Sequence, residues 1–249
     1  MKIKSNYLLV LDKERKEKIK NGLYEYTLIN MSYNTNRMEG STLSLSDTKD
    51  LFERNTLYTG GHNVDDIIEG KNHFDLFNFM LDTIKEPLTE RLIREYHQLL
   101  KRNTLDVANY GVEKYKGIPN IVGDQPTAEP HEVEDLMYRL VNEHPINDLM
   151  DILSFHHQFE LIHPFQDGNG RVGRIIMFRQ CLERDVTPFI IPSDKREEYI
   201  NGLKLFNEDP IVLKNEIENF QENYKKIAKP FLKVNSRNRR NENESELID

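Results

Sequence analysis

The chain has 249 residues, 37% of them hydrophobic and 31% charged, and a net charge of −8 at pH 7. This composition predicts one soluble globular domain with a sizeable core, and the negative charge argues against general nucleic-acid binding. No apolar run approaches the roughly 20 residues that span a bilayer, and the charged start of the chain is not a signal peptide. The single cysteine, Cys181, excludes a disulfide within the chain, so we expect a buried thiol in a cytoplasmic protein.

Apolar residues recur at helical spacing over most of the chain. The earliest clear stripe covers residues 23–38, and Thr89 is a plausible N-cap for a later one. The remaining helical stripes lie in residues 64–86, 88–102, 131–144, 147–162, 170–185, 196–206 and 212–233. Only residues 115–130 carry strand and turn signals typical of a short hairpin. We therefore predict an all-α fold with one short β-hairpin.

The chain shows no internal repeat and no polar linker that would divide residues 1–232. Residues 1–22 are interpreted as an N-terminal extension and residues 23–232 as one domain. From residue 233 to residue 249 apolar side chains are nearly absent, which predicts a disordered polar tail.

One segment, residues 163–174, concentrates the groups that phosphate chemistry needs. Its glycines let main-chain N–H groups turn inward, and the next helix begins there with free N–H groups, which together favour phosphate binding. Arg171 and Arg174 stand one helical turn apart and can bind further phosphate oxygens. Asp167 is a hard oxygen ligand suited to Mg²⁺. His163 is placed to accept a proton from a hydroxyl.

This segment, HPFQDGNGRVGR, also resembles the signature of the Fic family, His-x-Phe-x-Asp/Glu-Gly-Asn-Gly-Arg-x-x-Arg, at every defined position. The resemblance implies an all-α core and transfer of AMP from ATP, with Mg²⁺ or Mn²⁺, to a Ser, Thr or Tyr hydroxyl of a protein. Catalysis would consist mostly of positioning and charge stabilisation. The implied roles are general base for His163, metal ligand for Asp167, loop anchor for Phe165, α- and β-phosphate binding for Gly168, Asn169 and Gly170, and β- and γ-phosphate binding for Arg171 and Arg174.

The predicted hairpin resembles the Fic flap, which lies over the nucleotide and is preceded here by Tyr115 and Lys116. The resemblance implies that the flap holds the target segment by strand addition. Pro119 removes one main-chain donor from the docking edge, so the face that docks the target stays open. The residues expected to dock the target are Ile118, Asn120, Ile121 and Val122.

The segment 35–40, TNRMEG, resembles the Fic inhibitory motif, Ser/Thr-x-x-x-Glu-Gly/Asn. Thr35 and Glu39 share one face of a helix that spans about residues 24–39, and Gly40 suits its end. The resemblance implies that Glu39 pairs with Arg174 and occupies the charge intended for the γ-phosphate. In some members of the family the same glutamate positions a water that removes AMP, so this reverse hydrolysis stays open.

Three functions other than AMP transfer would use some of the same residues. Glu160-x-x-His163 supplies half of a di-iron site, but the chain shows no second copy. A module that binds nucleotide without transferring it has no need of His163. Transfer of another phosphate-linked group, such as UMP or phosphocholine, stays open because the loop recognises phosphates and not the base. The sequence does not identify the target protein, for which the chain itself is one candidate. It also does not determine whether the chain forms a homo-oligomer.

Overall fold

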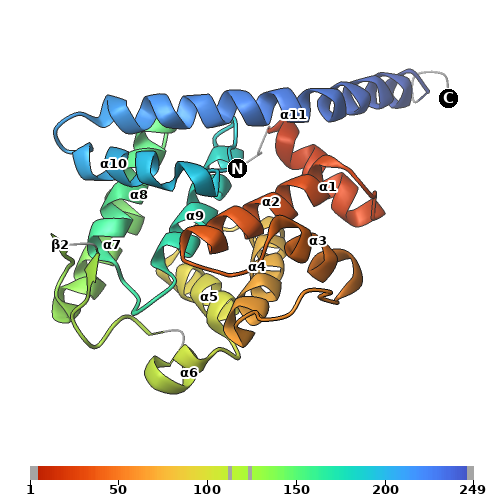
Figure 1. Cartoon of the computed structure of the whole chain (residues 1–249). Coiled ribbons are helices and arrows are strands. Elements are labelled where there is room, and N and C mark those ends of the chain that lie inside the picture. The colour runs from red at the N-terminus through yellow and green to blue at the C-terminus, as the bar shows by residue number, and fades with distance from the viewer. Residues whose placement is uncertain (1–4, 112–113, 123–124, 246–249) are drawn as a thin grey trace.

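The computed structural model describes residues 5–111, 114–122 and 125–245, which form a helical bundle with one small hairpin (Figure 1). Its elements are α1 (Asn6–Glu17), α2 (Leu23–Met38), α3 (Leu45–Arg54), α4 (Val64–Asp82), α5 (Glu90–Lys101), α6 (Leu105–Tyr110), β1 (Ile121–Val122), β2 (Gln125–Pro126), η1 (Pro130–Glu132), α7 (Val133–Glu143), α8 (Leu149–Ile162), α9 (Asn169–Glu183), η2 (Ser193–Lys195), α10 (Arg196–Leu205) and α11 (Pro210–Ser245). The fold confirms the predicted all-α class with one short hairpin.

Helix α9 is the central element of the bundle and packs against α2, α4, α5 and α8 (Figure 1). All but two of its fifteen residues are buried, including Cys181 at 0% exposure. A helix buried on every side must find protein partners for its polar side chains, because water cannot reach them. The three arginines of α9 that are buried, Arg171, Arg174 and Arg179, therefore depend on groups from the surrounding helices.

Arg179 is fully buried at 0% exposure and ties α9 to the middle of α5 and to the turn that follows α4. Its guanidinium donates to Tyr96 Oη at 2.6 Å, to the Thr83 carbonyl at 3.0 Å and to the Glu86 carbonyl. Its Nε donates to Glu183 at 2.7 Å on the same helix. This network satisfies one buried charge with partners from three segments.

The terminal helices pack into the same core as the centre of the bundle. In α1, Leu8, Val10 and Leu11 are buried against α2 and α11. Helix α11 crosses the bundle (Figure 1), and Tyr224 forms a hydrogen bond of 2.7 Å with Thr27 of α2. Residues 5–22, within the segment that the sequence predicts as an extension, thus contribute to the packing of the domain.

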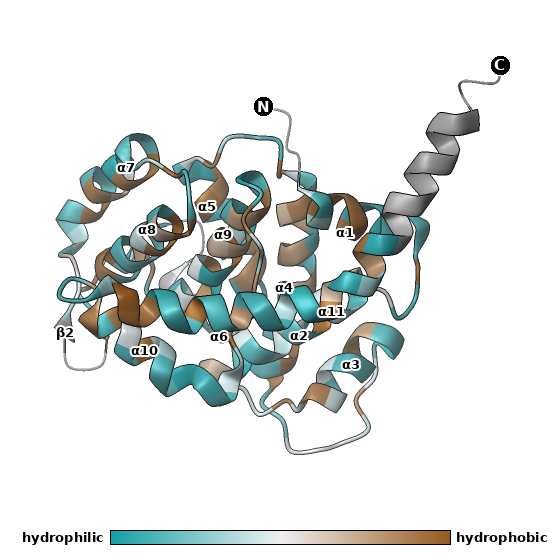
Figure 2. Ribbon diagram, turned by 90° about the horizontal axis from the view of Figure 1, so that it is seen from above, coloured by the Kyte–Doolittle hydropathy of each residue, from teal (hydrophilic) through white to brown (hydrophobic). Residues whose placement is uncertain are grey.

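Apolar residues of the helices face the interior of the bundle, while teal, hydrophilic residues follow the outward faces of α10 and α11 (Figure 2). Helix α11 continues to Ser245, into the segment for which the sequence predicts a disordered tail from residue 233. The disorder predicted for residues 233–249 stays a prediction. Residues 246–249 lie outside the described residues.

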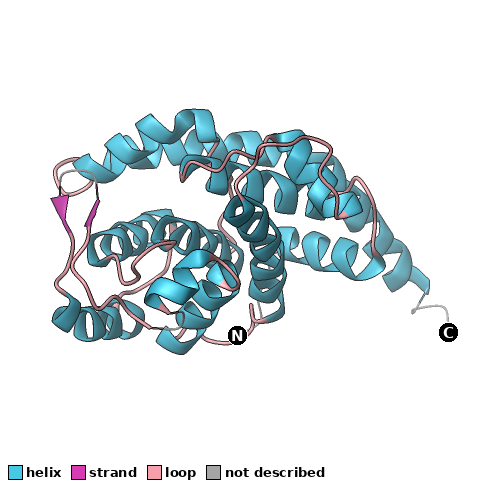
Figure 3. Ribbon diagram, turned by 60° about the horizontal axis from the view of Figure 1, so that its bottom comes forward, coloured by secondary structure: helices cyan, strands magenta, loops and turns pink. Residues whose placement is uncertain are grey.

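The hairpin stands at one edge of the molecule, beside the helices (Figure 3). Its two strands pair antiparallel, with Ile121 opposite Pro126 and Val122 opposite Gln125. Within the described ranges, no helix is both long enough and apolar enough to cross a membrane.

We predict that Arg179→Ala lowers the free energy of unfolding by about 3 kcal/mol or more. The substitution leaves the buried Glu183 carboxylate and the Thr83 and Glu86 carbonyls without their donor. Urea denaturation followed by circular dichroism measures the loss. Lys16→Ala, which removes an exposed pair with Asp12, is the control and should change the stability by less than about 0.5 kcal/mol. An Arg179 variant as stable as this control would contradict the assignment.

Candidate active site

The side chain of Asn169, the first residue of α9, bridges the loop between α8 and α9. Asn169 Oδ1 accepts the Phe165 N–H at 2.8 Å, and Asn169 Nδ2 donates to the Phe165 carbonyl at 2.8 Å. Gly168 precedes α9 with φ +83°, a left-handed conformation, and no side chain caps the first turn of the helix. The main-chain N–H groups at the start of α9 are therefore available to an anion, as predicted for a phosphate site.

Phe165 anchors this loop in the core, where it is 0% exposed. Its ring stacks on His97 of α5, with the ring centroids 3.9 Å apart and the planes at 3°. His97 Nε2 also forms a hydrogen bond of 3.0 Å with the Asp167 carbonyl. Helix α5 thus holds the loop through one histidine, whose part in the site the sequence analysis missed.

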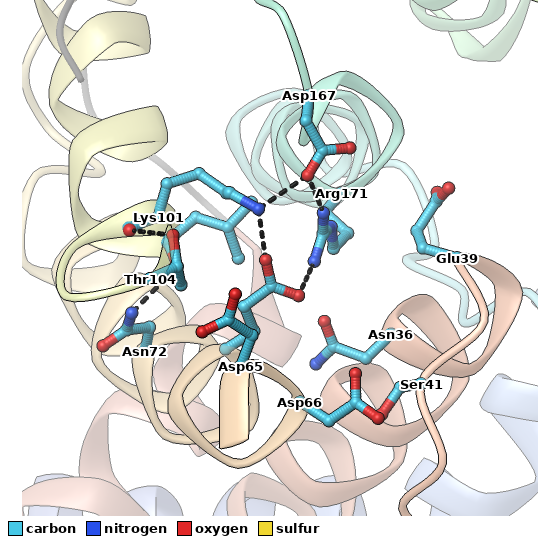
Figure 4. A network of polar contacts seen from close by, with 12 residues as sticks. Asn36, Glu39, Ser41, Asp65, Asp66, Asn72, Lys101, Thr104, Asp167 and Arg171 are labelled. Atoms are coloured by element: carbon cyan, nitrogen blue, oxygen red, sulfur yellow. Dashed lines mark hydrogen bonds and ion pairs between the residues drawn. The ribbon is translucent and has the colours of Figure 1, made fainter. Parts of the chain in front are cut away.

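Asp167 is clamped by two cations from neighbouring elements (Figure 4). Its Oδ2 accepts hydrogen bonds from Lys101 Nζ at 2.6 Å and from the Arg171 guanidinium at 2.8 Å. Although burial opposes ionisation, these two cations hold the pKa of Asp167 well below its usual range. Glu69 of α4 binds the same two cations from below, through separate oxygens. The Asp167 carboxylate is therefore ionised and fixed in direction.

The residues around Asp167 fit a divalent cation that is shared with phosphate oxygens. The Asp167 side chain is 50% exposed and directly precedes the anion-binding start of α9. Its carboxylate lies within 4.8 Å of the Glu69 and Asp106 carboxylates, but Lys101 already occupies the space between them, with Asp106 at 2.5 Å. Asp167 is consequently the residue that would hold the metal, with its remaining ligands from water and nucleotide.

His163 ends α8 in a left-handed conformation with φ 49°, which is uncommon for a residue other than glycine. The ring is mostly buried, and burial together with the nearby Lys116 ammonium lowers the pKa of His163 to about 4. The imidazole is therefore neutral near pH 7 and able to accept a proton.

Arg174 is held by residues 35–39 at the C-terminal end of α2. Its Nε donates to Thr35 Oγ1 at 2.5 Å, and one terminal nitrogen donates to Glu39 Oε1 at 2.5 Å and to the Thr35 carbonyl at 3.2 Å. Burial opposes ionisation of Glu39, but the Arg174 and Arg171 guanidinium groups outweigh it and lower the pKa of Glu39. The predicted pair of Glu39 and Arg174 is thus present, and Gly40 ends the segment with φ +95°.

Glu39 reaches into the anion-binding turn itself. A Cβ added to Gly170 would lie 2.6 Å from Glu39 Oε1 and 2.8 Å from an Arg174 terminal nitrogen. Gly170 therefore has room only for a hydrogen atom, because the Glu39 carboxylate and the Arg174 guanidinium fill the space where a side chain would lie.

The flap is fastened to the loop by polar side chains. Lys116 is buried and donates through Nζ to Asn120 Oδ1 at 2.7 Å and to the Ile162 carbonyl at 3.1 Å, while burial lowers its pKa to about 8. Asn120 Nδ2 donates to the Phe165 carbonyl at 3.0 Å. Of the four predicted docking residues, Ile118, Ile121 and Val122 are exposed, whereas Asn120 points to the loop.

The structure brings together the residues that the sequence places far apart, and it adds four others. Arg171, assigned to phosphate, lies between Glu69 and Asp167 and is 3% exposed, so in this structure it acts as a counter-ion. The residues that sequence reasoning missed at this site are Glu69, His97 and Lys101, and it named Lys116 only as the basic residue before the flap. The four-residue spacing of His97 and Lys101 on α5 is the signal that could have pointed to two of them.

His73 of α4 lies beneath the site and makes folding sensitive to acid. Burial and the Arg171 and Arg174 charges lower its pKa to about 3, and both ring nitrogens lack a hydrogen-bond partner. The unfolded chain protonates this histidine below about pH 6.5. Between those two pKa values the unfolded state binds more protons, so stability falls with decreasing pH by up to about 1.4 kcal/mol per pH unit.

We predict that His73→Leu flattens the loss of stability between pH 6.5 and pH 4, without lowering stability at pH 7, because two unsatisfied buried nitrogens disappear. Urea denaturation at a series of pH values measures both effects. His131→Leu, at an exposed histidine of η1, is the matched control and should keep the parental pH dependence. An unchanged slope in the His73 variant would count against a neutral buried ring.

Comparison with known proteins places this site in a family context. The model of the Fic/DOC family matches residues 87–181. The protein adenylyltransferase Fic of Drosophila grimshawi is 26% identical over 188 residues, which cover 72% of this chain and 38% of that protein. A probable protein adenylyltransferase of Aquifex aeolicus is 36% identical over 88 residues, covering 35% of this chain and 27% of that protein. The chain thus spans well under half the length of these curated relatives.

Solved structures show the same fold. A Fic domain containing signaling protein from Bacteroides thetaiotaomicron superposes with a TM-score of 0.78 at 22% identity, over 92% of this chain and 97% of that chain. The E274G form of Fic-1 from C. elegans, residues 134–508, superposes with a TM-score of 0.70 at 19% identity, over 92% of this chain and 72% of that chain. At these identities the likeness concerns the fold.

Proposed function

Given that the chain carries a Fic/DOC domain over residues 87–181, we propose that it is a protein adenylyltransferase inhibited by its own Glu39. It moves AMP from MgATP to a Ser, Thr or Tyr hydroxyl of a protein, which includes the chain itself. The observation that carries the proposal is the assembly of a neutral His163, an ionised Asp167 and a free start of α9 around one loop, with Arg174 bound to Glu39. The names of its relatives, protein adenylyltransferase Fic, support the same reaction.

In the proposed reaction the α-phosphate of ATP lies at the start of α9. His163 takes the proton of the target hydroxyl, its oxygen bonds to the α-phosphorus, and the bond to the β-phosphate oxygen breaks to release pyrophosphate. The first N–H groups of α9 and the Arg174 guanidinium stabilise the charge that develops on the phosphates. A metal ion at Asp167, Mg²⁺ or Mn²⁺, supplies charge neutralisation of the phosphate oxygens. The exposed flap residues Ile118, Ile121 and Val122 hold the target segment beside His163.

Inhibition follows from competition for one guanidinium. Arg174 donates to Thr35 and to the Glu39 carboxylate at the C-terminal end of α2. The γ-phosphate needs the same group and also meets the negative charge of Glu39. ATP therefore binds productively only when Glu39 leaves, and the free energy of the ion pair limits the activity of the parent chain.

We predict that Glu39→Gly raises self-labelling with ATP radiolabelled at the α-phosphate by roughly tenfold or more, as expected for loss of a charged hydrogen bond. Glu39→Gln, which keeps the shape and removes the charge, should give an intermediate rise. Adding His163→Ala to Glu39→Gly should reduce labelling by about a hundredfold or more, with ATP binding retained. Labelling that persists in the His163 variant at the same rate would show that this histidine is not the base.

Arg174 should distinguish ATP from ADP, which lacks the γ-phosphate. In the Glu39→Gly background, Arg174→Ala should weaken binding of ATP by roughly tenfold and that of ADP much less, because Arg174 is assigned to the γ-phosphate. Isothermal titration calorimetry with both nucleotides and Mg²⁺ measures the ratio. Equal losses for ATP and ADP would remove the assignment.

A panel of nucleotide donors distinguishes AMP transfer from transfer of another phosphate-linked group. In the proposed binding mode the phosphates contact main-chain N–H groups and arginines, which do not discriminate between bases. Transfer from UTP or CTP in preference to ATP would change the donor and leave the mechanism at His163 intact.

A further inference from the structure

The last turn of α8 carries a carboxylate beside the proposed base. Glu160 and His163 stand three residues apart, and Glu160 Oε2 lies 3.7 Å from His163 Nδ1. Both side chains are largely buried, at 15% and 16% exposure. His163 Nδ1 and Glu160 Oε1 are closed to water and have no hydrogen-bond partner. One nitrogen and one carboxyl group that could satisfy each other thus lie just beyond hydrogen-bond distance.

Buried polar atoms are rarely left unpaired, because each unsatisfied one costs the full desolvation free energy of the group. At 3.7 Å the two atoms are beyond hydrogen-bond range, so the contact needs a rotation of one of the two side chains.

Glu160 has a histidine near each of its two oxygens. His156 Nε2 lies 3.7 Å from Oε1, but it already forms a hydrogen bond of 2.5 Å with Tyr199 Oη of α10, and its Nδ1 is unpaired. His163 Nδ1 lies 3.7 Å from Oε2 and has no such partner. On the opposite side α9 presents Gly173, where a Cβ would lie 3.1 Å from Glu160 Oε1 and 2.7 Å from His156 Cε1. The absent side chain makes the space in which the carboxylate lies.

The charge state of Glu160 suits this role. Burial raises its pKa to about 7, and Arg174 from α9 opposes the rise while Glu39 from α2 adds to it. Near neutral pH a large fraction of Glu160 is thus ionised, and this carboxylate can accept a hydrogen bond from His163 Nδ1. The main-chain carbonyl of Glu160 also favours the protonated form of His163 and is the competing partner for the ring.

We propose that the Glu160 side chain is the positioning residue of His163: it accepts the Nδ1 hydrogen and leaves Nε2 free as the proton acceptor. When the target hydroxyl attacks the α-phosphorus, its proton moves to Nε2, and the resulting imidazolium is stabilised by the Glu160 carboxylate. The electron pair of the broken bond leaves with pyrophosphate. The transfer step rests on the proposed function, whereas the choice of tautomer does not.

The first test measures the tautomer of His163 in the folded, ligand-free chain by long-range nitrogen–proton correlation spectra at slightly alkaline pH. The parent should show the Nδ1–H tautomer. In Glu160→Leu, an apolar variant of similar volume, the Nε2–H tautomer should become the major form. Glu160→Gln should keep the Nδ1–H tautomer, because its amide oxygen still accepts. Retention of Nδ1–H in the leucine variant would show that the main-chain carbonyl orients the ring, and would overturn the proposal.

The second test measures transfer kinetics in the Glu39→Gly background. Glu160→Leu should lower kcat by about a hundredfold and Glu160→Gln by about tenfold, with KM for ATP changed by less than about twofold. Glu183→Gln removes another buried carboxylate, at the far end of α9, and should leave the tautomer and kcat at parental values. A parental kcat in the leucine variant would overturn the proposal. Absence of transfer in every variant would reject the proposed function, and the tautomer would still decide the role of Glu160.

Discussion

Glu69 is the carboxylate on which the charged half of the site depends. It lies on α4, is 9% exposed, and binds both Lys101 of α5 and Arg171 of α9. Without it two buried cations would lose a counter-ion, which is among the most destabilising changes a protein interior can suffer. Because the same two cations hold Asp167, one buried ion network fixes three helices and the direction of the candidate metal ligand (Figure 4).

The ion pair of Arg174 and Glu39 links α9 to the C-terminal end of α2. The Arg174 guanidinium donates to the Thr35 hydroxyl, the Thr35 carbonyl and the Glu39 carboxylate. Under the proposed function, a nucleotide phosphate at the start of α9 and Glu39 would compete for that guanidinium and for the space above Gly170, so each would weaken binding of the other. A signal that displaces the end of α2 would then change this balance.

The loop shows how a site of this kind is kept rigid without a sheet. Phe165 is stacked on His97, its main chain is bound by Asn169 and Asn120, and the flap is tied to the end of α8 through Lys116. The hydrogen bonds from Asn169, Asn120 and Lys116 satisfy main-chain groups that a glycine-rich loop would otherwise leave free, while the stacking on His97 holds the Phe165 ring. Rigid support of this type allows the N–H groups at the start of α9 to face an anion without reorganisation.

Much of this protein follows from the sequence by itself. Helical spacing of apolar residues predicts the all-α class, residues 23–38 as the helix now seen as α2, and a helix from Asn169 to Glu183, because these patterns are local. The resemblance of residues 163–174 and of Thr35–Gly40 to Fic motifs likewise indicates the residues of the loop and the pairing of Glu39 with Arg174.

Tertiary structure alone decided which distant groups complete the site. Nothing in the local sequence separates Glu69, Lys101 and His97 from solvated side chains, because each is a single polar residue in an ordinary helical pattern. Lys116 precedes the flap, but the sequence does not show which groups it contacts. Their roles arise from burial and from the packing of α4, α5 and the flap on α9, which bring charges from distant parts of the chain within hydrogen-bond distance.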